Sequence, residues 1–151
     1  MSDIYHYTEC GLDNVFIDGI DVVVDDDGDE VITITAINEL HKAIALGIVT
    51  HKHAISGDEL RFLRTEMGYT QSELARLVSH DKQSIGRWER AEYEVDGSAE
   101  TIIRRLAIEK LKLENNLGID ELASRSVPAV LIQEINIKKS NDNGHYELSV
   151  A

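Results

Sequence analysis

The sequence predicts an α+β protein with a small N-terminal β-sheet and one helix, a central all-α domain and a C-terminal β-hairpin. Apolar and polar residues alternate near both ends of the chain, as in half-buried strands. Between these ends, apolar residues recur every three or four positions, as in amphipathic helices. Alternation returns after Pro128, the only proline. We therefore expect three parts, at residues 1–54, 55–127 and 128–151.

The N-terminal part is predicted to contain three short strands and one helix. The strands cover residues 14–17, 21–24 and 31–35, and the last two flank the turn DDDGDE, whose Asp-Gly pair favours a hairpin. This acidic turn lacks the spacing and terminal Glu of an EF-hand loop, so we interpret it as solvated. Residues 36–49 follow the helical period, and their apolar stripe should pack on the sheet. That stripe consists of Ile37, Leu40, Ile44 and Ile48.

The central part begins with a helix at residues 57–67, which Gly68 should end. Its candidate core positions are Leu60, Phe62, Leu63 and Met67. Two short helices follow within residues 70–92. Thr70 should cap the first, with Glu73 in the capping-box position, and Asp81 should cap the second. The first has apolar residues at helical spacing, Leu74, Ala75, Leu77 and Val78, and the inward positions of the second are Ile85 and Trp88.

Two further helices complete the central part. Ser98 is expected to cap a helix that extends to about residue 113, and a short helix should follow at residues 120–126. Apolar positions of the longer helix that can close the core are Ile102, Ile103, Leu106 and Leu111.

The C-terminal part has the alternation of two paired strands on either side of the turn KSNDNG. The apolar residues of the two strands are Leu131, Ile135, Ile137, Tyr146, Leu148 and Val150. An isolated hairpin is marginal in water, so this one should pack on the rest of the chain or on a second subunit. Both arrangements remain open from the sequence.

Composition bounds the class of protein. No run of about 18 apolar residues occurs, so we expect no membrane span. The first residues lack a basic segment followed by an apolar one, which argues against export. The single Cys excludes an internal disulfide and suits a reducing cytoplasm, where we expect the protein to reside.

The net charge of −13 is unevenly distributed. Residues 1–40 carry 11 acidic side chains and no Lys or Arg. Residues 61–90 carry six basic and four acidic side chains, a balance of +2. A surface that contacts DNA phosphates needs Lys and Arg, and the central part is where they gather.

Two capped helices joined by a tight turn form a helix-turn-helix unit, whose second helix enters the DNA major groove. From about residue 56 to residue 92, the chain resembles the Xre/Cro helix-turn-helix family of bacterial and phage regulators, which has a lambda-repressor-like fold. The agreement covers Thr70-Gln71, Glu73-Leu74-Ala75, Ser84-Ile85, Arg87 and Glu89-Arg90. The order of parts also resembles MqsA-like antitoxins, in which a β-rich domain precedes an Xre-type domain.

The exposed side of the second helix supplies the candidate base-reading residues. Lys82 and Gln83 lie in its first turn, and Arg87 follows one turn later. Gln can form two hydrogen bonds with adenine, while Lys and Arg suit guanine O6 and N7. The family resemblance implies base or phosphate contacts at the same positions. The alternative is a polar face that is merely solvated.

Three further residues are candidates for phosphate contacts: Gln71, at the positive N-terminus of its helix, Ser84 and Arg90. Gly86 could allow close approach to DNA or be a tolerated poor helix former. The resemblance also implies a partly buried structural ion pair between Arg64 and Glu89.

His6, Cys10, His51 and His53 were considered as a zinc set, because MqsA-like antitoxins carry a Cys-based zinc site. One Cys cannot reproduce that pattern, so we expect no metal site. The sequence contains no nucleophile motif, phosphate-binding loop or paired-carboxylate site. We therefore expect neither enzymatic activity nor a cofactor.

The leading hypothesis is a transcriptional regulator, a repressor, that binds an inverted-repeat operator in double-stranded DNA as a homodimer. The alternative is an antitoxin whose acidic N-terminal domain neutralises a basic toxin and which represses its own operon. A third hypothesis is a helix-turn-helix fold that has lost DNA binding and serves as a protein-interaction module.

Overall fold

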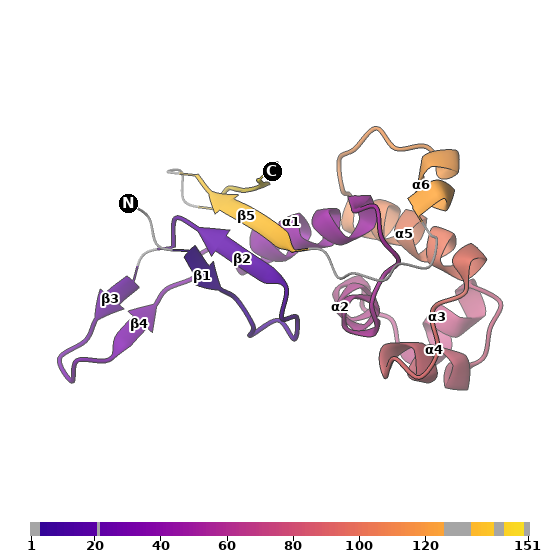
Figure 1. Ribbon diagram of the computed structural model, residues 1–151, viewed down its shortest axis with the longest axis horizontal. Helices are drawn as coiled ribbons and strands as arrows, with labels where there is room; N and C mark the ends of the chain where they lie inside the picture. Colours follow the sequence, from indigo (N-terminus) through magenta and orange to yellow (C-terminus); the bar gives the residue numbers. More distant parts are fainter. Residues whose placement is uncertain (1–3, 21, 126–133, 141–143, 150–151) are drawn as a thin grey trace.

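A β-sheet and a group of helices lie at opposite ends of the molecule, and the long helix α1 (Ile37–Thr50) joins them (Figure 1). The computed structural model describes residues 4–20, 22–125, 134–140 and 144–149. These residues confirm the predicted α+β class. No helix within these ranges is both long enough and apolar enough to cross a membrane.

The main sheet unites strands from both ends of the chain. Its order is β1 (Ile4–His6), β2 (Val15–Asp18), β5 (Ile135–Lys139) and β6 (Tyr146–Leu148). The predicted hairpin β5–β6 is antiparallel, and β5 pairs with β2 in parallel. The hairpin therefore packs within its own chain. Strand β1 was not expected from the sequence, and the expected sheet positions Leu131 and Val150 lie outside the described residues.

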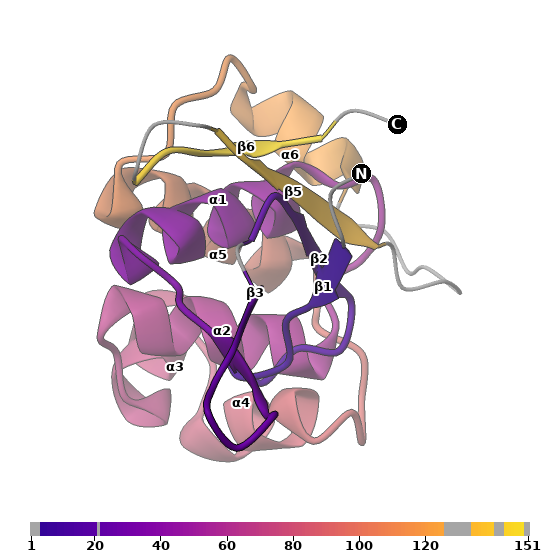
Figure 2. The same ribbon diagram turned by 90° about the vertical axis from the view of Figure 1, so that its left-hand side faces the viewer.

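A second, two-stranded sheet projects from the end of the molecule. It consists of β3 (Val22–Val24) and β4 (Glu30–Ile32), which pair antiparallel as predicted. The Asp25 carboxylate accepts hydrogen bonds from the backbone N–H groups of Asp27 and Asp29 at 3.0 and 2.8 Å, which closes the turn. Seen along the molecule, this hairpin stands nearest the viewer, in front of the helices (Figure 2).

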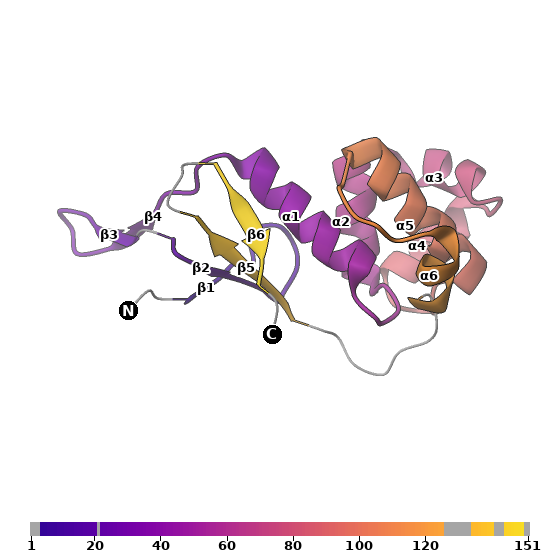
Figure 3. The ribbon, with the colours of Figure 1, turned by 90° about the horizontal axis from the view of Figure 1, so that it is seen from above.

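Helix α1 packs on the sheet and also on the helices, so it belongs to both cores (Figure 3). Its stripe residues Leu40, Ile44 and Ile48 are fully buried, as predicted. The prediction for Ile37 was wrong: this side chain is 49% exposed. It is the first residue of the helix.

The helical end contains α2 (Gly57–Met67), α3 (Gln71–Leu77), α4 (Lys82–Glu89), α5 (Gly97–Leu111) and α6 (Ile119–Arg125). All four predicted core residues of α2 are buried, and Gly68 ends that helix with a φ of 80°. The predicted cap of α5 was wrong. Asp96, not Ser98, accepts the hydrogen bond from the Ala99 N–H, so the helix begins at Gly97.

The prediction that Ile102 closes the core of α5 was also wrong, because its side chain is 39% exposed. The buried face of α5 is formed by two neighbouring rows of side chains along the helix, and Ile102 lies outside these rows. That face consists of Ala99, Glu100, Ile103, Arg104, Ala107 and Ile108.

A buried arginine fixes the loop between α1 and α2. The Arg104 guanidinium, fully buried on α5, pairs with the Glu100 carboxylate at 3.2 Å. It also donates hydrogen bonds of 2.5–3.3 Å to four carbonyl oxygens, those of Val49, His51, His53 and Arg125. Glu100 accepts a hydrogen bond from the Ile55 N–H at 2.9 Å. The loop between α1 and α2 is therefore firmly anchored to α5.

Polar contacts join the sheet to α2. The Asn14 amide donates to the Glu59 carboxylate at 3.3 Å, and His51 approaches the same carboxylate at 3.3 Å. Burial would raise the pKa of Glu59, but the hydrogen bonds and charge of its partners outweigh this and lower it. The sheet is thus held against the first helix of the central domain.

Candidate nucleic-acid interface

Helices α3 and α4 form a helix-turn-helix unit with the predicted caps. Thr70 and Glu73 complete a capping box at the start of α3. Asp81 accepts a hydrogen bond from the Ser84 N–H at 2.8 Å at the start of α4, and this bond holds the pKa of Asp81 below its usual value. The turn between the helices contains Ser79, whose φ of 59° lies in the left-handed region.

The inward face of the unit largely matches the predicted core. Leu74, Ala75, Val78, Ile85 and Trp88 are all buried. Leu77, the remaining apolar residue of α3, is 45% exposed. At 100° per residue, Leu77 lies roughly 100° around α3 from the centre of its buried face, so it points sideways into solvent.

A buried carboxylate links α4 to the two preceding helices. Arg64 on α2 donates two hydrogen bonds to Glu89, from Nε at 2.5 Å and from Nη2 at 3.0 Å. The Gln71 amide donates to the same carboxylate at 3.1 Å, and Arg61 reaches it from the solvent side. Burial would raise the pKa of Glu89, but the hydrogen bonds from Arg64 and Gln71 and the charge of Arg64 lower it.

Close backbone approach holds α2 against the end of α4. A Cβ atom on Gly57 would lie only 2.5 Å from the Glu89 carbonyl oxygen. Glycine at this position lets the first turn of α2 touch the last turn of α4. Together with the ion pair at Glu89, this contact fixes the direction in which α4 presents its outer face.

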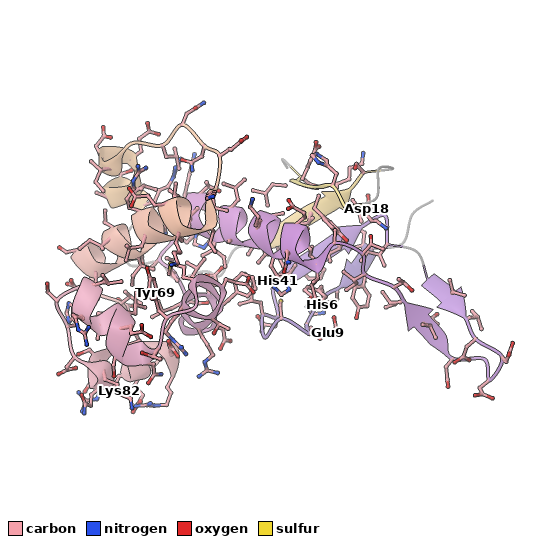
Figure 4. All side chains as sticks on the ribbon, turned by 180° about the vertical axis from the view of Figure 1, so that it is seen from behind. His6, Glu9, Asp18, His41, Tyr69 and Lys82 are labelled. Atoms are coloured by element: carbon pink, nitrogen blue, oxygen red, sulfur yellow. The ribbon has the colours of Figure 1, made fainter. Side chains whose placement is uncertain are left out.

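The three candidate base-reading residues lie on that outer face. Lys82, Gln83 and Arg87 are all exposed on α4. Figure 4 shows Lys82 at the outer edge of the helical end, at the opposite end of the molecule from Asp18 in the sheet. The Arg87 guanidinium lies 6.0 Å from the centre of the Tyr93 ring, a residue that sequence reasoning missed. A helix that exposes hydrogen-bond donors on its outer side is suited to enter the DNA major groove.

The three candidate phosphate-binding residues lie in three different environments. Gln71 directs its amide group to Glu89 within the protein. Ser84 is half-buried in the first turn of α4. Arg90 is exposed and pairs with Glu92 at 2.5 Å. Of the three, Arg90 has the charge and exposure that suit a phosphate contact.

The Arg90–Glu92 pair leads to a prediction. Both side chains are more than half exposed, at 58% and 51%, so the pair is weak. Replacing Glu92 by Gln should free Arg90 and raise DNA affinity by up to about fivefold at low salt. Fluorescence anisotropy at several salt concentrations would measure this gain. Glu94→Gln removes the same charge without releasing Arg90, and an equal gain there would contradict a specific role for the pair.

Gly86 lies in the middle of α4 and is buried. A Cβ atom there would meet the Arg90 guanidinium at 3.0 Å. The residue therefore makes room for Arg90 on the protein itself, and both sequence-based interpretations of Gly86 remain open.

The four residues considered for zinc do not form one group. His6 contacts the Asp13 carbonyl oxygen at 2.6 Å, and His51 faces Glu59 in the domain contact. The Cys10 thiol is directed to the Tyr7 carbonyl oxygen, and burial raises the pKa of that thiol. Within the described ranges, no cluster of three or more His, Cys, Asp or Glu side chains could hold a metal ion.

Comparison with known proteins agrees with this geometry. Residues 60–99 match the family model described as "Helix-turn-helix", a segment that runs from the first turns of α2 to the start of α5. Searches of curated proteins and of solved structures found no match. The matched segment contains the capped α3–α4 pair and all three exposed candidate readers. Residues 60–99 are therefore similar to a helix-turn-helix domain.

Proposed function

We propose that this protein is a sequence-specific DNA-binding regulator, acting in the cytoplasm, that represses transcription by inserting α4 into the major groove of its operator. The observation that carries the proposal is the contrast between the two sides of α4. Ile85, Trp88 and Glu89 anchor one side in the core, while Lys82, Gln83 and Arg87 extend from the other. A firmly packed helix with exposed donors on its outer face is what direct base readout requires.

Each exposed residue has a chemical role in this proposal. Gln83 pairs with the N6 and N7 atoms of adenine, and Lys82 and Arg87 pair with O6 and N7 of guanine. Arg90 contacts the phosphate backbone and sets the register of α4 in the groove. The exposed basic side chains of residues 61–90 supply attraction that the acidic sheet end does not.

We further propose that the protein binds as a homodimer. One α4 helix reads only a few base pairs, so a single domain gives limited affinity. Two copies related by a two-fold axis would place their α4 helices about 34 Å apart, on successive major-groove turns. The operator would then be an inverted repeat.

Alanine variants of the readers test this function. Arg87→Ala and Lys82→Ala should each weaken binding to the preferred site by about 1–3 kcal/mol, and should relax base preference at the position they read. Lys138→Ala is the matched control, because it removes an exposed positive charge from β5 at the other end of the molecule. Gel shifts at fixed salt would measure all three. Reader variants that bind like the control would overturn the proposal.

A second candidate function is neutralisation of a basic toxin, with the chain acting as an antitoxin that represses its own operon. The specific observation in favour is the separation of charge along the molecule. The turn of the projecting hairpin β3–β4, which carries Asp25, Asp26, Asp27, Asp29 and Glu30, lies at the opposite end of the molecule from α4 (Figure 1). The two functions use different surfaces and are compatible.

A further inference from the structure

The projecting hairpin β3–β4, residues 22–32, which we name the hairpin arm, exposes apolar side chains. Val23, Val24 and Val31 are 57%, 62% and 43% exposed. Val23 and Val31 are paired across the strands, so they share one face, and Val24 lies on the other. Both faces of the arm therefore present valine to solvent.

The arm has little support from the rest of the chain. Its two strands form a sheet of their own, and neither pairs with another strand in the part of the chain that the structure describes. A two-stranded ribbon is marginally stable in water, and its outer edges carry unpaired backbone N–H and C=O groups. Exposed β-branched residues beside free strand edges are the features of a surface that another protein covers.

Charge distinguishes between the two possible occupants, a second copy of this chain and a different protein. The tip carries Asp25, Asp26, Asp27, Asp29 and Glu30. No Lys or Arg occurs among residues 1–40, so the arms of two copies would bring like charges together. A surface rich in Lys and Arg would gain electrostatic attraction at the tip and cover the valines behind it.

We infer that the hairpin arm is the docking surface for a protein partner that presents an apolar strand edge flanked by positive charge. This inference rests on the second candidate function, neutralisation of a basic toxin. It adds the place on the chain where such a protein binds. The arm and α4 lie at opposite ends of the molecule (Figures 1 and 3). Partner and DNA therefore bind at the same time, without competing for one surface.

The test uses the full chain and a defined probe, a fluorescent peptide of alternating Val and Lys, which reproduces both features of the partner. The first variant is Val23→Thr/Val31→Thr, which keeps branched side chains in the strands and removes apolar surface. The second is Asp26→Asn/Asp27→Asn, which removes two charges and leaves Asp25 to hold the turn. Glu114→Gln/Glu121→Gln is the matched charge control, at exposed positions of the helical end.

The inference requires that the peptide bind the wild type and the control equally, and each arm variant at least fivefold more weakly. Peptide affinity should be unchanged when the chain is saturated with DNA. Equal binding to wild type and arm variants would overturn the docking surface. Sedimentation showing a wild-type dimer that Val23→Thr/Val31→Thr dissociates would identify a second copy as the occupant instead. DNA affinity of the same variants, measured separately, tests the proposed regulator function and leaves the two outcomes distinguishable.

Discussion

Arg104→Met is expected to lower the free energy of unfolding by about 3–5 kcal/mol. The substitution removes a fully buried cation and with it the ion pair of the Glu100 carboxylate, which stays buried in the core. It also removes hydrogen bonds to the carbonyl oxygens at the end of α1 and in the loop that follows. Chemical denaturation monitored by circular dichroism measures the loss.

The neighbouring residue provides a matched control. Arg105 lies on the same helix and pairs with Glu109 at 3.2 Å, but its side chain is 47% exposed. Arg105→Met should therefore change the free energy of unfolding by only about 0.5 kcal/mol. Similar losses for the two variants would show that Arg104 does not anchor the loop.

The Glu89→Gln substitution should also lower the free energy of unfolding strongly, and the size of this loss should depend on pH. At pH 7 the free energy of unfolding of the variant should be about 3 kcal/mol lower than that of the wild type. The reason is that Arg64 is left without the carboxylate to which it donates two hydrogen bonds. The pKa of Glu89 is lowered in the folded state. Its stabilisation is therefore complete above the unfolded pKa of about 4.3 and is lost as pH falls below that value toward the folded pKa.

The difference between wild type and Glu89→Gln should consequently shrink as the pH is lowered from 5 to 3. Denaturation curves at a series of pH values measure this convergence. Glu73→Gln serves as a control for the size of the effect, because the pKa of Glu73 is also lowered but this exposed carboxylate caps α3 and has no buried arginine partner among the described residues. A difference between wild type and Glu89→Gln that stays constant down to pH 3 would contradict the assignment of the ion pair.

Local rules were sufficient to predict the helix-turn-helix unit. Thr70 and Asp81 are caps whose partners lie within three residues, and Gly68 ends α2 through its own backbone conformation. Such signals depend on short stretches of chain, so the sequence shows them directly. Exposed positions of α4 follow from the same helical period.

Contacts between distant parts of the chain could not be predicted in this way. The parallel pairing of β2 with β5 joins residues separated by more than a hundred positions, and neither strand specifies its neighbour. Arg104 and Glu100 were missed because charged residues are normally assigned to solvent. Their placement on the apolar face of α5, one turn apart, was the available signal.

The central claim, that α4 reads DNA, is tested most directly by selecting bound sequences from a random double-stranded DNA pool at about 150 mM salt. We predict enrichment of an inverted repeat with half-sites about one helical turn apart, and loss of preference at one position of each half-site for Arg87→Ala. A pool that shows no enriched sequence, or the same enriched sequence for wild type and Arg87→Ala, would contradict that claim.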